Sequence, residues 1–230
     1  MSINQKKYLS MLCFVISAFT MLFYIFLTFK NILSFPGILF YSMIICGSLI
    51  IGILFYNQNC TQSIQSRNLR FMGYMLFAFY IFQLIYLLFF ASEFARDYVD
   101  LSSASYREAL IKQWTYYTNL TPFTTIHQMI TIFYIPSISN TIPLINLFGN
   151  FIAFIPFSLF AIILFPQKSK PYRFLFIMSI IIVSIEVIQF FTLTGSMDID
   201  DFILNFSGAA ISYFILRYSP IKSHLSKVIK

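Results

Sequence analysis

The sequence contains few charged residues and few cysteines. Only 10% of its 230 residues are charged and 59% are hydrophobic, whereas about a quarter of the residues in a soluble domain are charged. The chain therefore lacks the polar side chains needed to cover a soluble globule, which predicts an integral membrane protein. Of its three cysteines, Cys13 and Cys46 fall in hydrophobic segments and Cys60 in a polar loop. This leaves no extracytoplasmic pair for a disulfide, and the spacing does not suit a zinc site.

Six apolar segments are long enough to cross the roughly 30 Å of hydrocarbon in a bilayer. They are Tyr8–Phe29, Pro36–Tyr56, Phe71–Ala91, Ile142–Phe165, Phe174–Thr192 and Asp201–Tyr218. The stretch from Ser92 to Thr141 is too polar to span. No linker, low-complexity tract or repeat divides the chain. We therefore predict an all-α fold, a six-helix transmembrane bundle that forms a single membrane domain over residues 1–230.

The distribution of basic residues predicts the orientation, because Lys and Arg near helix ends are retained in the cytoplasm. If the N-terminus lies inside, eleven basic residues are cytoplasmic: Lys6, Lys7, Arg67, Arg70, Lys168, Lys170, Arg173, Arg217, Lys222, Lys227 and Lys230. Lys30, Arg96, Arg107 and Lys112 lie outside, and none of the eight acidic residues is cytoplasmic. We therefore expect both termini in the cytoplasm of a multi-pass protein of the cell membrane. The net charge of +7 then reflects a basic rim facing anionic lipid headgroups, with no need for nucleic acid as a partner.

An amphipathic helix is predicted on the outer face, between the third and fourth membrane helices. Tyr106, Leu110, Trp114 and Tyr117 recur at spacings of four, four and three, which places them on one helical face. Such a helix could lie in the plane of the lipid headgroups. It could equally pack across the outer mouth of the bundle, because both arrangements need the same period. The threonines of the following stretch, Asn119-Leu-Thr-Pro-Phe-Thr-Thr-Ile126, can cap a further helix.

Polar residues inside the fourth and fifth hydrophobic segments are candidate binding residues. Asn146 and Asn150 share a helical face near the outer end, and amides are costly against lipid, so we expect them to face the bundle. They could serve as interhelical hydrogen-bond glue or bind a ligand. Glu186 lies about 18 Å along the fifth helix, just past the midplane, and shares its face with Gln189. An ionisable group at that depth costs about 2.5 kcal/mol or more, so Glu186 is a functional candidate, although a protonated, purely structural role is the alternative.

The turn into the last helix carries three acidic residues, Asp198, Asp200 and Asp201. They could be helix caps. Three acids so close exceed what capping requires, however, and need a cation, hydrogen-bond donors or shifted pKa values. Oxygen-only clusters suit Ca²⁺ or Mg²⁺, so these aspartates are candidate metal ligands and no other cofactor is expected. Asn205 lies on the same helical face as Asp201.

These residues resemble the VanZ-like family of membrane proteins, which is associated with resistance to teicoplanin and related glycopeptides. Three blocks between Asn119 and Ser212 carry the resemblance. They are Asn119 to Ile126; Asn146-x-x-Gly149-Asn150-x-x-x-Phe154-x-Pro156; and Glu186-x-x-Gln189 followed by Asp198-x-Asp-Asp201-x-x-x-Asn205-x-x-Gly208. The resemblance implies a role in the cell envelope and in the response to antibiotics.

Three functional hypotheses follow from these patterns. In the first, the last three helices form an outward-opening polar pocket that binds an amphiphilic envelope molecule, such as a lipid-bearing glycopeptide or a lipid-linked wall precursor. In the second, Asp198, Asp200 and Asp201 hold a cation and Glu186 is the general base of a hydrolase or transferase acting on a lipid-linked substrate, although no His, Ser or Cys constellation accompanies them. The third, proton or cation transport through Glu186, needs a path across the apolar residues beneath it.

Overall fold

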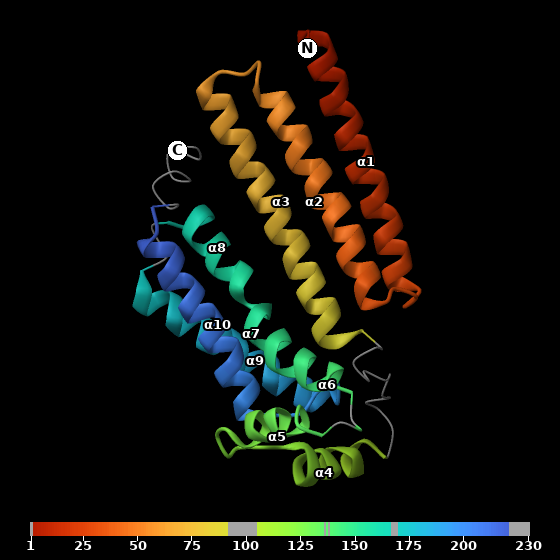
Figure 1. Ribbon diagram of the computed structural model, residues 1–230, viewed down its shortest axis with the longest axis vertical. Helices are drawn as coiled ribbons and strands as arrows, with labels where there is room; N and C mark the ends of the chain where they lie inside the picture. The colour runs from red at the N-terminus through yellow and green to blue at the C-terminus, as the bar shows by residue number, and fades with distance from the viewer. Residues whose placement is uncertain (1, 92–104, 136, 138, 167–169, 221–230) are drawn as a thin grey trace. The chain divides into compact units, whose positions relative to one another are not determined.

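The protein is built from α-helices, and its computed structural model describes residues 2–91, 105–135, 137, 139–166 and 170–220 (Figure 1). In chain order the helices are α1 (Ile3–Phe29), α2 (Phe35–Asn57), α3 (Gln62–Phe89), α4 (Tyr106–Tyr117), α5 (Thr124–Ile132), α6 (Thr141–Leu144), the π-helical turn η2 (Ile145–Gly149), α7 (Asn150–Ala153), α8 (Ile155–Leu164), α9 (Pro171–Thr192) and α10 (Ile199–Tyr218). No β-strand occurs in these ranges. The predicted all-α fold is confirmed.

The six predicted membrane spans are confirmed within the described residues. The segments that are long and apolar enough to cross a membrane are Ile3–Phe29, Phe35–Asn57, Gln62–Phe89, Thr141–Leu164, Pro171–Thr192 and Ile199–Tyr218. The cytoplasmic position of both termini stays a prediction. Four of the basic residues that predict it, Lys168, Lys222, Lys227 and Lys230, lie outside the described residues, as does Arg96.

The described chain groups into two compact units, one reaching Tyr80 and the other running on from Ile81. The first, unit 1, contains α1, α2 and most of α3, and the second, unit 2, contains the end of α3 and all later helices. The single-domain interpretation of the sequence stays a prediction. Every candidate binding residue falls in unit 2.

In unit 1, α1 and α2 form a helical hairpin joined by serine side chains. The Ser10 hydroxyl donates to the Gly52 carbonyl at 2.9 Å, and the Ser17 hydroxyl donates to the Ile45 carbonyl at 3.1 Å. A Cβ atom on Gly52 would lie 2.8 Å from the Phe14 ring. Small residues and interhelical hydrogen bonds are what hold helices together in lipid, where burial of apolar surface gives little.

In unit 2, the fourth span is interrupted twice, whereas the hydropathy pattern predicted one continuous segment. Its backbone widens into the π-helical turn η2 before Asn150, and it breaks again at Phe154, between α7 and α8. Pro156 begins the next helical turn and has no N–H to continue the ladder of the preceding helix. The two interruptions divide the span into short pieces, of which α7 and α8 pack against α10.

The packing of this span against α10 is very tight. An ideal Cβ atom on Gly208 would lie 1.8 Å from the Phe151 carbonyl oxygen, so only glycine fits at this crossing. Further along, the Ser158 hydroxyl donates to the Ala209 carbonyl at 2.8 Å, and the Ser212 hydroxyl donates to Ser158 at 2.9 Å. These contacts fix α7 and α8 against α10.

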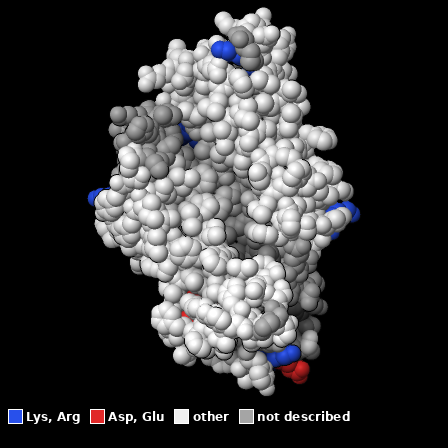
Figure 2. Space-filling view, viewed as in Figure 1, with Lys and Arg blue, Asp and Glu red and all other residues white. Residues whose placement is uncertain are grey.

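Apolar side chains dominate the surface of the spans. Residues such as Phe19 and Phe176 are largely exposed, as expected of side chains that face lipid tails. Figure 2 shows one face of the molecule, on which Lys, Arg, Asp and Glu are sparse.

Candidate functional site

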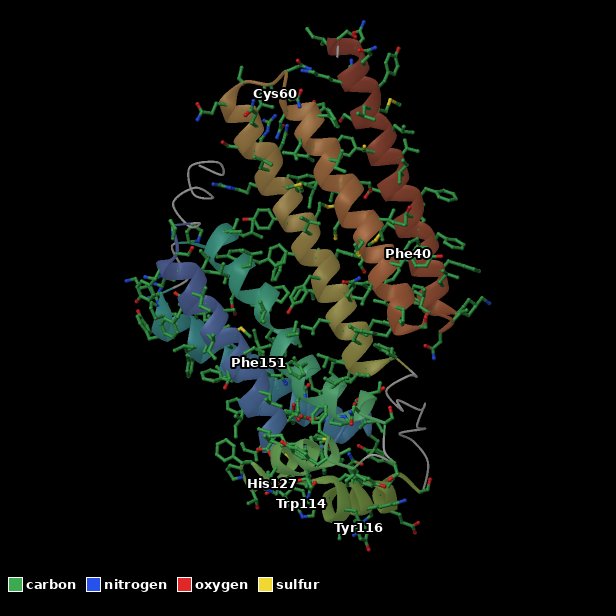
Figure 3. All side chains as sticks on the ribbon, viewed as in Figure 1. Phe40, Cys60, Trp114, Tyr116, His127 and Phe151 are labelled. Carbon is green, nitrogen blue, oxygen red and sulfur yellow. The ribbon has the colours of Figure 1, made fainter. Side chains whose placement is uncertain are left out.

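At one end of unit 2, α4 and α5 lie against the ends of α9 and α10 (Figure 1). The turn between α9 and α10 lies at this end, and it carries the three aspartates. Figure 3 labels Trp114 and Tyr116 on α4 and His127 on α5 in this region.

Asp198 joins this turn to the start of the Asn119–Ile126 stretch. Backbone hydrogen bonds pair the two segments, from the Asn119 N–H to the Met197 carbonyl and from the Ile199 N–H to the Asn119 carbonyl, each at 2.9 Å. The Asp198 carboxylate accepts from the Asn119 amide at 3.1 Å and from the Thr125 hydroxyl at 2.6 Å. The same carboxylate caps α10 by accepting the Asp200 N–H at 2.9 Å. One side chain therefore fixes the turn, the stretch and the start of the last span.

Asp200 caps α5, a helix that lies more than seventy residues earlier in the chain. Its two carboxylate oxygens accept the Phe123 N–H and, at 3.1 Å, the Ile126 N–H. The side chain is fully buried, at 0% exposure. Phe123 has a left-handed backbone, with φ 67°, and α5 has no side-chain cap from its own flank. The expectation that threonines of the stretch cap this helix is therefore wrong, because the first turn of α5 lies against the carboxylate of Asp200.

Asp201 joins the fourth and sixth spans. The Asn150 amide, at the start of α7, donates a short hydrogen bond to the Asp201 carboxylate on α10. Asn146 precedes Asn150 by four residues and Asn205 follows Asp201 by four, so each lies about one turn away on its own helix. The side-chain oxygens of Asn146 and Asn205 are buried and have no hydrogen-bond partner among the described residues. Asn205 as a whole is only 4% exposed. We refer to Asn146, Asn150, Asp201 and Asn205 as the amide–carboxylate cluster.

Gln189 joins α9 to the end of α3. It is buried on α9, and its amide donates to the Leu88 carbonyl in the last turn of α3 at 3.0 Å. Glu186 lies one turn earlier on α9 and is 7% exposed. Its depth in the membrane and its role as general base stay predictions.

The amphipathic helix is confirmed as α4, and it packs against the end of α9. The Tyr106 hydroxyl donates to the Phe191 carbonyl at 2.7 Å, which satisfies a carbonyl in the last turn of α9. The Gln113 amide donates to the Gly195 carbonyl in the α9–α10 turn, also at 2.7 Å. Gln113 and Asn119 were not among the candidate residues predicted from the sequence. Polar residues that bond to distant backbone give no periodic signal by which they could be found.

The three aspartates bind protein donors and do not converge as metal ligands. Their carboxylates accept from different groups, on Asn119 and Thr125, on the first turn of α5, and on Asn150. The described residues contain no group of three or more His, Cys, Asp or Glu side chains that could hold a metal ion. A bound divalent cation stays a prediction. Three acidic residues can lie close together here because each carboxylate accepts hydrogen bonds from its own set of N–H or O–H groups.

A family model described as VanZ/LLP1 matches residues 77–221. No curated protein and no solved structure matches the chain. The matched residues include α4, α5 and all the aspartate, asparagine and glutamine contacts described above.

Proposed function

The chain belongs to the VanZ/LLP1 family, and from this premise we propose that it binds an amphiphilic molecule of the cell envelope in the plasma membrane. The ligand would be a lipid-bearing glycopeptide of the teicoplanin type or a lipid-linked wall precursor, and binding would contribute to glycopeptide resistance or to envelope homeostasis. Its acyl tail would lie among the spans, and its polar head would meet the amide–carboxylate cluster.

The proposal rests chiefly on the buried amide oxygen of Asn205. An unpartnered polar group away from water costs about 1–3 kcal/mol, and the oxygens of Asn205 and Asn146 have no partner among the described residues. A ligand that donates hydroxyl or amide hydrogens would supply the missing hydrogen bonds. The Asn150–Asp201 pair is part-buried, so the protein does not fully enclose it.

Asp198 and Asp200 were predicted from the sequence as candidate metal ligands, whereas in this proposal they position other segments. Their carboxylate oxygens already accept hydrogen bonds from Asn119, Thr125 and the start of α5. They therefore position the segments around the site, and direct ligand contact falls to the amide–carboxylate cluster. Glu186 and Gln189 are buried on α9. They would contact the ligand only where it reaches a deeper part of the same site.

The test compares Asn205→Leu with the parent chain in a bacterium that is susceptible to teicoplanin. Leucine has a similar shape and no acceptor, so the variant should fold while one ligand hydrogen bond, about 1 kcal/mol, is lost. That loss corresponds to about fivefold weaker binding. We expect the protection against teicoplanin to fall at an unchanged level of protein in the membrane. Asn140→Leu is the matched control, because Asn140 is exposed and its side chain makes no cap hydrogen bond to α6.

Two results would argue against the proposal. Equal protection by Asn205→Leu, Asn140→Leu and the parent would mean that the cluster does not bind the ligand. Turnover of a lipid-linked substrate by the purified protein in vesicles, dependent on Mg²⁺ or Ca²⁺ and lost in Glu186→Gln, would instead favour the metal-assisted hydrolase or transferase.

A further inference from the structure

One flank of α4 carries large apolar side chains that remain more than half exposed. Ile111, Trp114 and Tyr117 are 58%, 57% and 53% exposed, and we refer to them as the Trp114 surface. On the polar side of the helix, Glu108 and Lys112 are also exposed. In water, apolar area of this kind costs about 25 cal/mol per Å² relative to burial, so the Trp114 surface needs an apolar neighbour.

The position of α4 indicates what that neighbour is. The Trp114 ring packs edge-on against the Phe190 ring, with 6.1 Å between their centroids, and Tyr106 bonds to the Phe191 carbonyl. Phe190 and Phe191 belong to the last turns of α9, which is long and apolar enough to span a membrane. Phe191 is itself 53% exposed, as part of the apolar exterior of the span. The Trp114 surface therefore continues the lipid-facing exterior of unit 2 at the end of a span.

We infer that the Trp114 surface lies in the lipid headgroup layer, so that α4 is an interfacial helix as well as a packed one. Trp and Tyr favour this layer because their rings are apolar and their N–H and O–H groups reach water. Arg107 is exposed on the same stretch of α4, and its guanidinium can reach lipid phosphates along the headgroup layer. The helix thus meets lipid with one flank and the protein with another.

This placement fixes the depth of the acidic turn. Gln113 on α4 holds the Gly195 carbonyl in that turn, and Asp198 closes it against Asn119. If α4 lies among the headgroups, the turn is held at the level of the lipid heads. The inference concerns lipid alone and does not depend on the proposed ligand.

The experiment uses the intrinsic fluorescence of Trp114, the single tryptophan of the chain. The full-length protein is placed in vesicles of phosphatidylcholine and phosphatidylglycerol whose acyl chains carry bromine, a quencher, either close to the glycerol or near the terminal methyl. Iodide added to the water serves as the aqueous quencher. We expect the strongest loss of emission from bromine close to the glycerol, a weaker loss from the deeper bromine, and the smallest loss from iodide.

A matched variant moves the tryptophan to the other side of the same helix. Tyr116 lies about 200° around the helix from Trp114 and is 76% exposed. In the double variant Trp114→Phe with Tyr116→Trp, iodide should therefore quench more strongly than either bromolipid. The parent measurement stands by itself if this variant fails to fold.

Three results would overturn the inference. Strong quenching of Trp114 by iodide with none by bromolipid would place the surface in water. Stronger quenching by the deeper bromine would place it within the hydrocarbon. Shielding from both quenchers would mean that protein covers it, for example a second copy of this chain.

Discussion

Replacing Gly208 by alanine should loosen the last span from the fourth. The added Cβ would lie 1.8 Å from the Phe151 carbonyl oxygen, whereas carbon and carbonyl oxygen approach to about 3.3 Å at closest. The two helices must therefore separate by about 1.5 Å. Overpacking typically costs 1–3 kcal/mol. Because the obstacle is backbone that cannot rotate away, we expect about 3 kcal/mol, near the top of that range.

This loss can be measured as a lower unfolding temperature of the purified protein in detergent or lipid. For a chain of this size, 1 kcal/mol corresponds to about 2–4 °C, so Gly208→Ala should unfold about 6–12 °C below the parent. The separation would also pull Asn150 away from Asp201, since both belong to the helices forced apart. Under the proposed function, protection against teicoplanin should fall together with stability.

Gly149→Ala is the matched control for this prediction. Its added Cβ would meet only a methyl group of Ile145, at 3.9 Å, which is ordinary contact. Alanine also favours helix over glycine by about 0.8 kcal/mol, so this variant should be as stable as the parent or more so. If Gly208→Ala unfolds at the same temperature as Gly149→Ala, the close approach of α7 and α10 is refuted.

Three other substitutions test the remaining contacts. Asp200→Ala leaves the N–H groups of Phe123 and Ile126 without their acceptor, which should cost about 3 kcal/mol and speed hydrogen exchange in α5; unchanged exchange would contradict the capping role. Phe123→Gly should stabilise the protein by about 1 kcal/mol, because glycine adopts the left-handed backbone found there without strain; a lower unfolding temperature would count against this. Ser158→Ala should cost only about 0.6 kcal/mol, since the Ser212 hydroxyl lies 3.0 Å from the Ala209 carbonyl and is then free to donate to it; a loss of several kcal/mol would mean that this serine does more than join two helices.

The six spans could be predicted because hydrophobic length is a property of each segment alone. The amphipathic α4 followed for a similar reason, since the spacing of Tyr106, Leu110 and Trp114 needs no partner to be recognised. Sequence could also locate the acidic turn and the inward-facing amides Asn146 and Asn150, because polar groups in lipid must have a reason to be there.

The partners of these groups could not be predicted, because each depends on segments far apart in the chain. Asp200 looked like a cap for its own helix and instead caps α5, while Gln189 reaches the Leu88 carbonyl on α3. The two interruptions of the fourth span could not be predicted either, because hydropathy carries no information about backbone hydrogen bonds. Pro156 was the one local sign of it.

The contact between Asp200 and α5 has a consequence for the order in which the chain assembles. The nine-residue helix is too short to persist by itself in water, where about 12–15 residues are needed. The Asp200 carboxylate, which caps the first turn of this helix, is synthesised 74 residues after Ile126. During translation, this segment must therefore wait until the final span emerges and enters the bilayer. Nascent chains arrested before that point should carry it as an unstructured loop, open to proteases at the membrane surface.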